Sequence, residues 1–178
     1  MGVHHLTHDI TPYNTFEASY RLFQTVEYWP EGTTFVSVVD PGVGSSRKSV
    51  VALTKTGQYI VTPDNGTLSY IKKVVGIEAV REISEVENRR SNTELSYTFH
   101  GRDVYAYTGA KLSSGHISFE EVGPELPVDK ILELPVVETI IEDNLVRGAI
   151  DILDVRFGSL WTSITRDDFY ALEPNFGD

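Results

Sequence analysis

Two short runs combine ionisable side chains with sharp turns, and each follows a stretch that predicts a β-strand. The first run, Val38–Gly44, reads Val-Val-Asp-Pro-Gly-Val-Gly and carries Asp40. The second, Thr98–Asp103, reads Thr-Phe-His-Gly-Arg-Asp and carries His100, while Arg47 lies close to the first run. Because an open α/β sheet binds its ligand at the carboxyl ends of its strands, these turns are where a site is expected. A carboxylate, a guanidinium and an imidazole brought together there can activate a water molecule.

Each of these residues also has an ordinary structural interpretation. An aspartate before Pro-Gly, such as Asp40, is about as often a turn cap as a functional group, and a lone arginine is more often a solvated surface residue. The loop favours function, because Gly42 and Gly44 allow close backbone approach and expose N–H groups. Folding Arg47 back onto Asp40 would keep the carboxyl ionised. His100 is either structural or catalytic, and its ordinary pKa of about 6.5 suits proton transfer.

Two other groups of charged residues have weaker claims to function. The histidines His4, His5 and His8 form a cluster, but they lack the helical or turn spacing of zinc ligands, so a metal site is the minor alternative. Arg102 and Asp103 predict an internal ion pair at the start of a helix. We therefore expect no metal site.

Two further runs stay open between structure and function. Pro63–Gly66 is first of all a turn, although its Asp64 and Asn65 follow another strand and would border the same cleft. Asp154–Trp161 holds a carboxylate, two aromatic residues and a glycine. That run predicts a β-bulge with core aromatics, and the alternative is a site for a ligand with an ammonium group and a flat ring.

Strands and helices alternate along the segments that must position these residues. Apolar, β-branched runs predict strands over residues 34–39, 49–53, 58–62 and 78–83. Asn14, as a helix cap with Glu17 three residues later, predicts the first helix. Further helices are predicted over residues 67–75 and 102–112. Strand–turn–helix units favour a layered α/β domain with a central, mostly parallel sheet over a β-sandwich.

The pattern changes after residue 124, where strands are predicted over 130–142 and 146–153 without a helix between them. We therefore expect an α/β domain over residues 1–128 and the beginning of a smaller β domain over residues 129–178.

Composition limits the classes of partner. The chain has 178 residues, enough for one good-sized domain or one domain and part of another. Its net charge of −11 argues against nucleic acid, because no basic stripe is present to release phosphate counterions. No apolar run reaches the roughly 20 residues needed to span a bilayer, and the first residues do not resemble a signal peptide. Without cysteine there are no disulfides or thiolate nucleophiles. These features predict a soluble, cytoplasmic protein with no membrane partner.

Five stretches, in order and spacing, resemble the S-adenosyl-L-methionine (SAM) hydroxide adenosyltransferase family, relatives of the SAM-dependent fluorinases and chlorinases. The stretches are Leu6–Pro12, Val38–Gly44, Pro63–Gly66, Thr98–Asp103 and Asp154–Trp161. The resemblance implies hydrolysis of SAM to adenosine and methionine by attack of water at the ribose 5′ carbon, with no metal or cofactor. Because a sulfonium is a good leaving group, the enzyme must chiefly orient the water and take its proton.

The same resemblance implies roles for individual residues. The set that activates water falls on Asp40, Arg47 and His100. The residues implied in substrate binding are Tyr13 beside the ligand, Phe99 and Gly101 at the ribose and reaction centre, Asp154 at the methionine ammonium group, and Phe157, Ser159 and Trp161 around the adenine. Ser159 departs from the asparagine usual at its position.

The resemblance also implies an assembly and two missing segments. Family members are homotrimers whose sites lie between the first domain of one subunit and the β-barrel-like second domain of its neighbour. The family's first strand, with its ribose-binding Asp-Phe-Gly turn, does not precede Val3, and the second domain is expected to continue beyond Asp178. We therefore expect a chain shortened at both ends.

Two alternatives remain beside a SAM hydrolase. A SAM-dependent halogenase is disfavoured, because halogenating relatives lack the Asp–Arg–His set. A non-catalytic nucleoside-binding or structural fragment is favoured by the missing ribose-binding aspartate.

Overall fold

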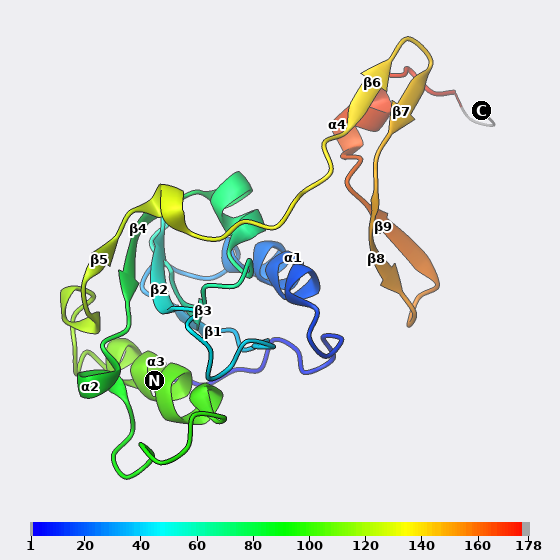
Figure 1. Ribbon diagram of the computed structural model, residues 1–178. Helices are drawn as coiled ribbons and strands as arrows, with labels where there is room; N and C mark the ends of the chain where they lie inside the picture. Colours follow the sequence, from blue (N-terminus) through cyan, green and yellow to red (C-terminus); the bar gives the residue numbers. More distant parts are fainter. Residues whose placement is uncertain (1, 176–178) are drawn as a thin grey trace. The chain divides into compact units, whose positions relative to one another are not determined.

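A five-stranded sheet forms the centre of the first of two compact units, whose boundary in the sequence lies between Leu134 and Pro135. The structure, a computed structural model, describes residues 2–175. The strand order in the sheet is β1-β3-β2-β4-β5 (Figure 1). The strands are β1 (Thr34–Val36), β2 (Ser49–Thr54), β3 (Tyr59–Pro63), β4 (Ile77–Glu82) and β5 (Glu125–Leu126).

The strand directions correct one expectation. The α/β class with a central sheet is confirmed, but the mostly parallel direction is wrong. Within the described sheet β1 and β3 run parallel, while β3–β2, β2–β4 and β4–β5 are antiparallel. Only four residues, 55–58, join β2 to β3, and Gly57 takes a positive φ of +87° in that turn. Because a parallel crossover needs a dozen or more residues, so short a link produces a hairpin.

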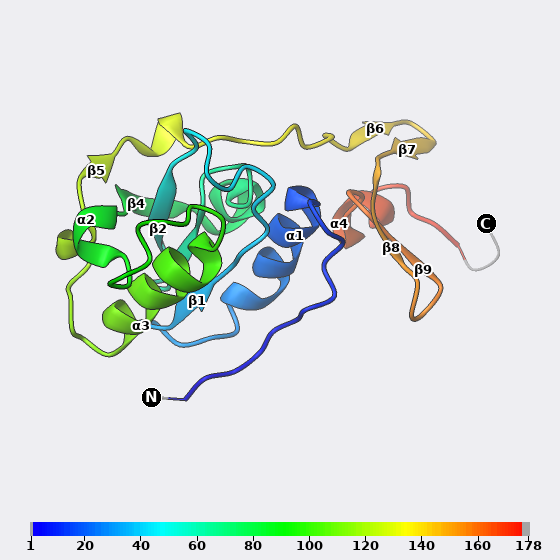
Figure 2. The ribbon, with the colours of Figure 1, turned by 60° about the horizontal axis from the view of Figure 1, so that its bottom comes forward.

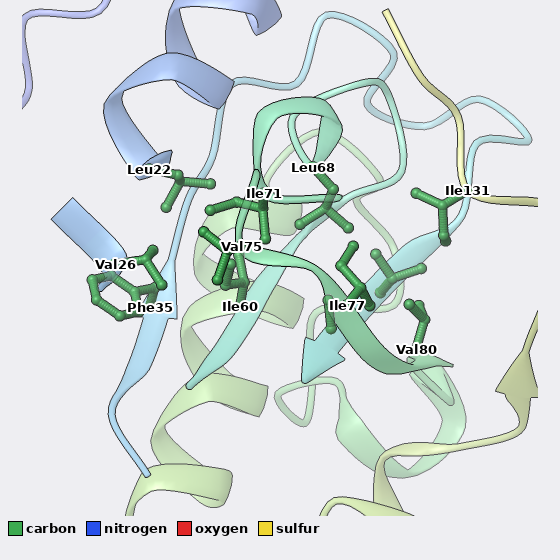
Figure 3. Packing of buried hydrophobic residues seen from close by; sticks show 12 residues of the cluster. Leu22, Val26, Phe35, Ile60, Leu68, Ile71, Val75, Ile77, Val80 and Ile131 are labelled. Atoms are coloured by element: carbon green, nitrogen blue, oxygen red, sulfur yellow. The ribbon is translucent and has the colours of Figure 1, made fainter. Parts of the chain in front are cut away.

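Helices cover both faces of the sheet (Figures 1 and 2). Alternate residues of β2 point to opposite faces, so Val50 and Ala52 join one buried cluster and Val51 the other. Helix α1 and the wide turn η1 cover the first face, and η2 and α3 cover the second. Figure 3 shows the first cluster from close by. The helical elements of this unit are α1 (Thr15–Val26), η1 (Ile71–Val75), α2 (Glu85–Asn88), η2 (Gly101–Ala106), α3 (Tyr107–Ser113), η3 (Glu120–Val122) and η4 (Val128–Lys130).

Helix α1 begins where its capping residues predict. The side chain of Asn14 accepts a hydrogen bond from the backbone N–H of Glu17 at 2.9 Å. The Glu17 carboxylate accepts from the N–H of Thr11 at 3.0 Å, instead of closing the box on Asn14. The cap therefore ties the helix to the turn that precedes it.

Several strand ends meet at one edge of the sheet. Because β1 and β3 are parallel, both end at that edge, and β2 begins there with Ser49 opposite Pro63. Strand β4 ends at the same edge, with Glu82 opposite Val50. The segments that leave this edge are residues 37–48, 64–66 and 83–89. The topology thus gathers loops from distant parts of the chain.

The second unit consists of two hairpins and a short helix. Its elements are β6 (Ile140–Glu142), β7 (Leu145–Arg147), β8 (Ile150–Asp154), β9 (Ser159–Thr162) and α4 (Arg166–Tyr170). β6 pairs with β7 and β8 with β9, both antiparallel. The strand expected over 130–142 is confined to its last three residues. Residues 129–134 belong to the first unit, where Ile131 packs in the core.

Candidate active site

Asp40, Arg47 and His100 meet at the sheet edge where β1 and β3 end. Nε of Arg47 donates to Oδ1 of Asp40 at 2.8 Å and Nη2 donates to Oδ2 at 2.5 Å, so the ion pair is bidentate. The same Nη2 lies 2.9 Å from Nδ1 of His100. The side chains of Asp40 and Arg47 are 6% and 9% exposed, and His100 is 4% exposed. The predicted Asp40–Arg47 pair is confirmed, and His100 lies against it.

The loop that carries Asp40 is held by a hydrogen bond from the turn after β3 and by a backbone hydrogen bond of its own. The side-chain amide of Asn65 donates to the carbonyl of Val39 at 2.8 Å, and Oδ1 of Asn65 accepts from the hydroxyl of Thr67 at 2.8 Å. Within the loop, the backbone N–H of Val43 donates to the carbonyl of Asp40 at 3.2 Å. The turn after β3 therefore helps to position the turn after β1.

Two residues that the sequence analysis missed complete the polar network. Nη1 of Arg47 donates to Oγ of Ser49 at 2.9 Å, and that oxygen lies 3.1 Å from the hydroxyl of Tyr105. The Tyr105 hydroxyl donates to Oδ2 of Asp40 at 3.4 Å, and burial raises its pKa far above the ordinary value, so it stays protonated. Ser49 begins an apolar strand and Tyr105 lies between Val104 and Ala106, so neither carries a local signal of function.

A second arginine contacts the other side of the imidazole. Nη2 of Arg89 lies 3.0 Å from Nε2 of His100 and also donates to the carboxylate of Glu85 at 2.6 Å. Burial lowers the pKa of His100 below its ordinary 6.5, Arg47 and Arg89 lower it further, and Glu85 opposes them. The sequence predicts a polar loop here, where the structure has helix α2. The four-residue spacing of Glu85 and Arg89 was the available signal.

The expected substrate-binding residues of the first unit lie at its surface. Phe99 is 57% exposed, and the guanidinium of Arg102 stands 5.1 Å from its ring centroid. A Cβ on Gly101 would come within 3.1 Å of a methyl group of Val38, so glycine lets η2 begin close to the strand-end loop. Tyr13 is 79% exposed, just before the cap of α1, with a positive φ of +69°. The structure thus places Phe99 and Gly101 directly beside His100, and Tyr13 in another loop.

The four residues expected from the second unit share the hairpin β8–β9. Asp154 ends β8 opposite Ser159, and Trp161 faces Ile152 across the strands. Oδ1 of Asp154 accepts from the N–H of Phe157 at 3.3 Å. Phe157 is 86% exposed in the turn, so this aromatic residue is not part of a core.

The structure also places the two groups of charged residues that had weaker claims to function. Arg102 and Asp103 form the predicted ion pair, with Nε 2.6 Å from Oδ1. His5 and His8 touch through Nδ1 and Nε2 at 2.9 Å. Among residues 2–175, no group of three or more His, Asp or Glu side chains is placed to hold a metal ion. In the same range, no helix is both long and apolar enough to cross a bilayer.

A cavity of about 330 Å³ lies beside the loop that carries Asp40. Its walls include Phe35, Val38 and Val39, and therefore the two residues that precede Asp40. Arg21 of α1 and His8 line it as well. The cavity is mainly apolar, and its lining stops at Val39, the residue before Asp40.

Comparisons with known proteins agree with these features. A family model described as the SAM hydroxide adenosyltransferase N-terminal domain matches residues 1–123. The (R)-S-adenosyl-L-methionine hydrolase of Methanocaldococcus jannaschii is 36% identical over 163 residues, which cover 92% of this chain and 54% of the relative. A fluorinase of Actinopolyspora mzabensis is 26% identical over 193 residues, covering 96% of this chain and 64% of the relative.

A solved structure is also similar. The crystal structure of an uncharacterized conserved protein from Thermotoga maritima has a TM-score of 0.91 and 37% sequence identity, and the match covers 100% of this chain and 66% of that one. The chain thus spans between about half and two thirds of the length of the relatives that it matches.

Proposed function

Because this chain belongs to the SAM hydroxide adenosyltransferase family, we propose that it contributes the catalytic trio for hydrolysis of SAM to adenosine and methionine. The observation that carries the proposal is the buried contact of Asp40, Arg47 and His100 at the edge where strand ends meet. Ligands bind at such edges in α/β folds. The curated relative with 36% identity is named as a hydrolase of the same substrate.

The proposed reaction is a single displacement. The oxygen of water bonds to the ribose 5′ carbon, the bond from that carbon to sulfur breaks, and its electron pair stays on sulfur as the neutral thioether of methionine. The proton lost by water passes to the imidazole of His100 and from there to solvent. An imidazole that is neutral at pH 7 is ready for this step, and proton transfer of this kind contributes roughly 10²–10⁴-fold to the rate.

The ion pair supplies orientation in this proposal. Arg47 donates from two edges of its guanidinium, because Nε and Nη2 hold Asp40 while Nη1 holds Ser49. A donor with so many partners has a fixed position, and fixed groups align water with the carbon–sulfur bond. Phe99 and Gly101 are proposed to line the ribose and reaction centre, and Tyr13 to flank the substrate. Asp154 is proposed to contact its amino-acid group, and Phe157, Ser159 and Trp161 its adenine.

Product analysis tests the proposal against its nearest alternative. We would incubate the chain with each sulfonium epimer of SAM in chloride buffer and separate the products by chromatography. Adenosine and methionine are expected, preferentially from the (R) epimer, since the named relative hydrolyses that form. A 5′-chloro nucleoside would instead support the halogenase suggested by the fluorinase similarity. SAM left intact in the presence of demonstrable nucleoside binding would support a non-catalytic binding protein.

Three finer points belong to the same proposal. The assembly is proposed to be a homotrimer with sites between subunits, which sedimentation of the purified protein tests. Turnover is proposed to need no metal, so excess chelator should leave the rate of adenosine formation unchanged. The cytoplasm is proposed as the location, and cell fractionation tests it.

A further inference from the structure

The imidazole of His100 is held between two guanidinium groups. Nδ1 lies 2.9 Å from Nη2 of Arg47, and Nε2 lies 3.0 Å from Nη2 of Arg89. Each arginine is in turn paired with a carboxylate, Asp40 on one side and Glu85 on the other. The arrangement is therefore nearly symmetrical about the ring, although only the Asp40 side belongs to the trio.

The hydrogen-bonding capacity of these groups restricts the charge of the ring. Arginine donates hydrogen bonds and cannot accept them, and a neutral imidazole has one nitrogen that accepts and one that donates. Whichever nitrogen of His100 carries the hydrogen, the other can accept from one guanidinium. The protonated ring would donate from both nitrogens and would face a cationic donor on each side. The contacts therefore disfavour imidazolium.

We propose that Arg89 is a positioning residue for the reaction proposed above: anchored by Glu85, its guanidinium faces Nε2 of His100 and, together with Arg47, keeps the ring unprotonated and fixed in place. This inference rests on the proposed function for its catalytic meaning. The arrangement of the groups around the ring exists whether or not the substrate is SAM.

The burial of Arg89 supports a specific role. Its side chain is 5% exposed, and Nη1 is buried without a hydrogen-bond partner in the part of the chain that the structure describes. Its guanidinium stands 5.1 Å from the ring centroid of Tyr97, which covers it. An arginine that served stability alone would be expected to satisfy all of its buried donors, because burying an unpaired donor is unfavourable. Arg89 instead leaves Nη1 unpaired, while its Nη2 contacts both Glu85 and His100.

The two arginines differ in how firmly they are held. Arg47 has two contacts to Asp40 and one to Ser49 besides the imidazole. Arg89 has one carboxylate, and the side chain of Glu85 is 34% exposed. Since a neutral ring can accept from only one of the two guanidinium groups, the contact with Arg89 is the less firmly held of the two.

Several charged or titratable side chains face the ring, and their charges affect the pKa of His100. The groups that face His100 are Asp40 and Arg47 from the loop after β1, Glu85 and Arg89 from α2 and the residue after it, Tyr97 from the following loop and Tyr105 from η2. Of these, Arg47 and Arg89 lower the pKa of the histidine, whereas Glu85 and Asp40 raise it. Replacing Arg89 and replacing Glu85 should therefore act in opposite directions.

Titration of the histidines by NMR tests the inference without any need for turnover. The chain has five histidines, and the signal lost in His100→Gln identifies the one of interest. We expect Arg89→Met to raise the pKa of His100, Arg89→Lys to leave it close to the wild-type value, and Glu85→Gln to lower it. The matched control is Arg147→Met, which removes an exposed arginine paired with Glu142 in the other unit.

Two results would overturn the inference. One is a pKa of His100 that is unchanged in both Arg89→Met and Glu85→Gln, and the other is a shift in the same direction in both. If Arg89→Met does not fold, Glu85→Gln and Arg89→Lys still decide, since Glu85 is partly exposed and lysine keeps the cation.

Kinetics separate this inference from the proposed function. If the wild-type chain forms adenosine, the acid limb of kcat/KM should move with the pKa of His100 in each variant. An acid limb of kcat/KM at the same pH in every variant would overturn the positioning role of Arg89 without contradicting SAM hydrolysis. If the wild type forms no adenosine, the proposed function fails, and opposite NMR shifts would still establish that Arg89 controls the ring.

Discussion

At the scale of single residues, Arg47 is the centre of the site. Its guanidinium holds both oxygens of Asp40, the hydroxyl of Ser49 and one nitrogen of His100. Such a planar group with several fixed partners is well suited to bidentate recognition of a carboxylate. Removing one partner from a buried ion pair leaves the other charge uncompensated. Substitutions of the ion pair should therefore affect the stability of the fold as well as the rate of the reaction, and both must be measured.

Asp40→Asn should strongly reduce both activity and stability. We expect the rate of adenosine formation to fall by about 10²–10⁴-fold, because Arg47 loses the partner that fixes it against His100, the proposed base. Breaking the buried pair should lower the free energy of unfolding by about 3–5 kcal/mol. Thermal melts and product assays measure the two effects. The control Asp129→Asn removes a carboxylate whose side chain is 73% exposed and should change neither. Near wild-type turnover in Asp40→Asn would contradict the catalytic role.

The pH dependence should report His100. Because the proposed base acts as neutral imidazole, kcat/KM should fall on the acid side with an apparent pKa below 6.5, the direction in which burial and the arginines move it. The lowered pKa also means that the folded state binds fewer protons than the unfolded state. Stability should therefore be present above pH 6.5 and decline as the pH falls through the lower pKa of the folded protein.

Two curves test this expectation. A rate profile whose acid limb lies above pH 6.5 would contradict it. In His100→Gln, the melting temperature should depend less steeply on pH between neutrality and mild acid than in the wild type, since the variant lacks the group that titrates.

At the scale of elements, the site depends on strand ends that share one edge. The loop after β1 supplies Asp40, and the turn after β3 supplies Asn65, which holds the carbonyl of Val39. His100 precedes η2, a wide helical turn of a kind that frequently marks functional sites. The helix α2, after β4, adds Glu85 and leads into Arg89. No single element contains the site, so its geometry depends on the register of the sheet.

Asn65→Ala should therefore loosen the trio without removing any of its members. The variant loses the hydrogen bond to the Val39 carbonyl, which contributes about 0.5–1.5 kcal/mol of stability. We expect kcat to fall about tenfold or more, because small displacements of aligned groups are costly to the rate. Exposed Asn144→Ala is the matched control and should leave both quantities unchanged. A variant that loses stability but keeps its full kcat would show that Asn65 has only a structural role.

At the scale of the whole chain, the two units differ in how much they bury. The first unit has two apolar clusters, one on each face of its sheet. Within residues 135–175, Ile152 is the only buried residue. Local stability follows the density of buried apolar contacts. The two units should therefore open with very different free energies.

Hydrogen exchange should resolve this difference. We expect amides of β2 and β3 to exchange slowly, at rates set by global unfolding, and those of β8 and β9 to exchange quickly. Mass spectrometry of peptides from the two units measures both in one experiment. Protection of β8 and β9 equal to that of β2 would mean that the second unit is stabilised by contacts beyond those described, such as the subunit contacts of the proposed trimer.

The sequence by itself determined the features that depend on neighbouring residues. Asn14 starts α1, because a cap bonds the N–H three positions later. Asp40 and Arg47 pair across a short glycine-containing loop, which their spacing predicts. The order and spacing of the five stretches named in the sequence analysis were specific enough to identify the family. The cap and the ion pair depend on contacts within a few residues of the chain.

Only the tertiary structure decided which distant groups share the site. His100 lies 53 positions from Arg47, and Tyr105 lies 65 positions from Asp40, so no local pattern joins them. The sheet expected to be mostly parallel is instead mostly antiparallel, because a four-residue link joins β2 and β3 in a hairpin. Arg89 gained its place beside His100 in the same way. Hydrogen bonds of a turn or cap are encoded locally, whereas a site built from several strand ends exists only once strand order and direction place those ends at one edge.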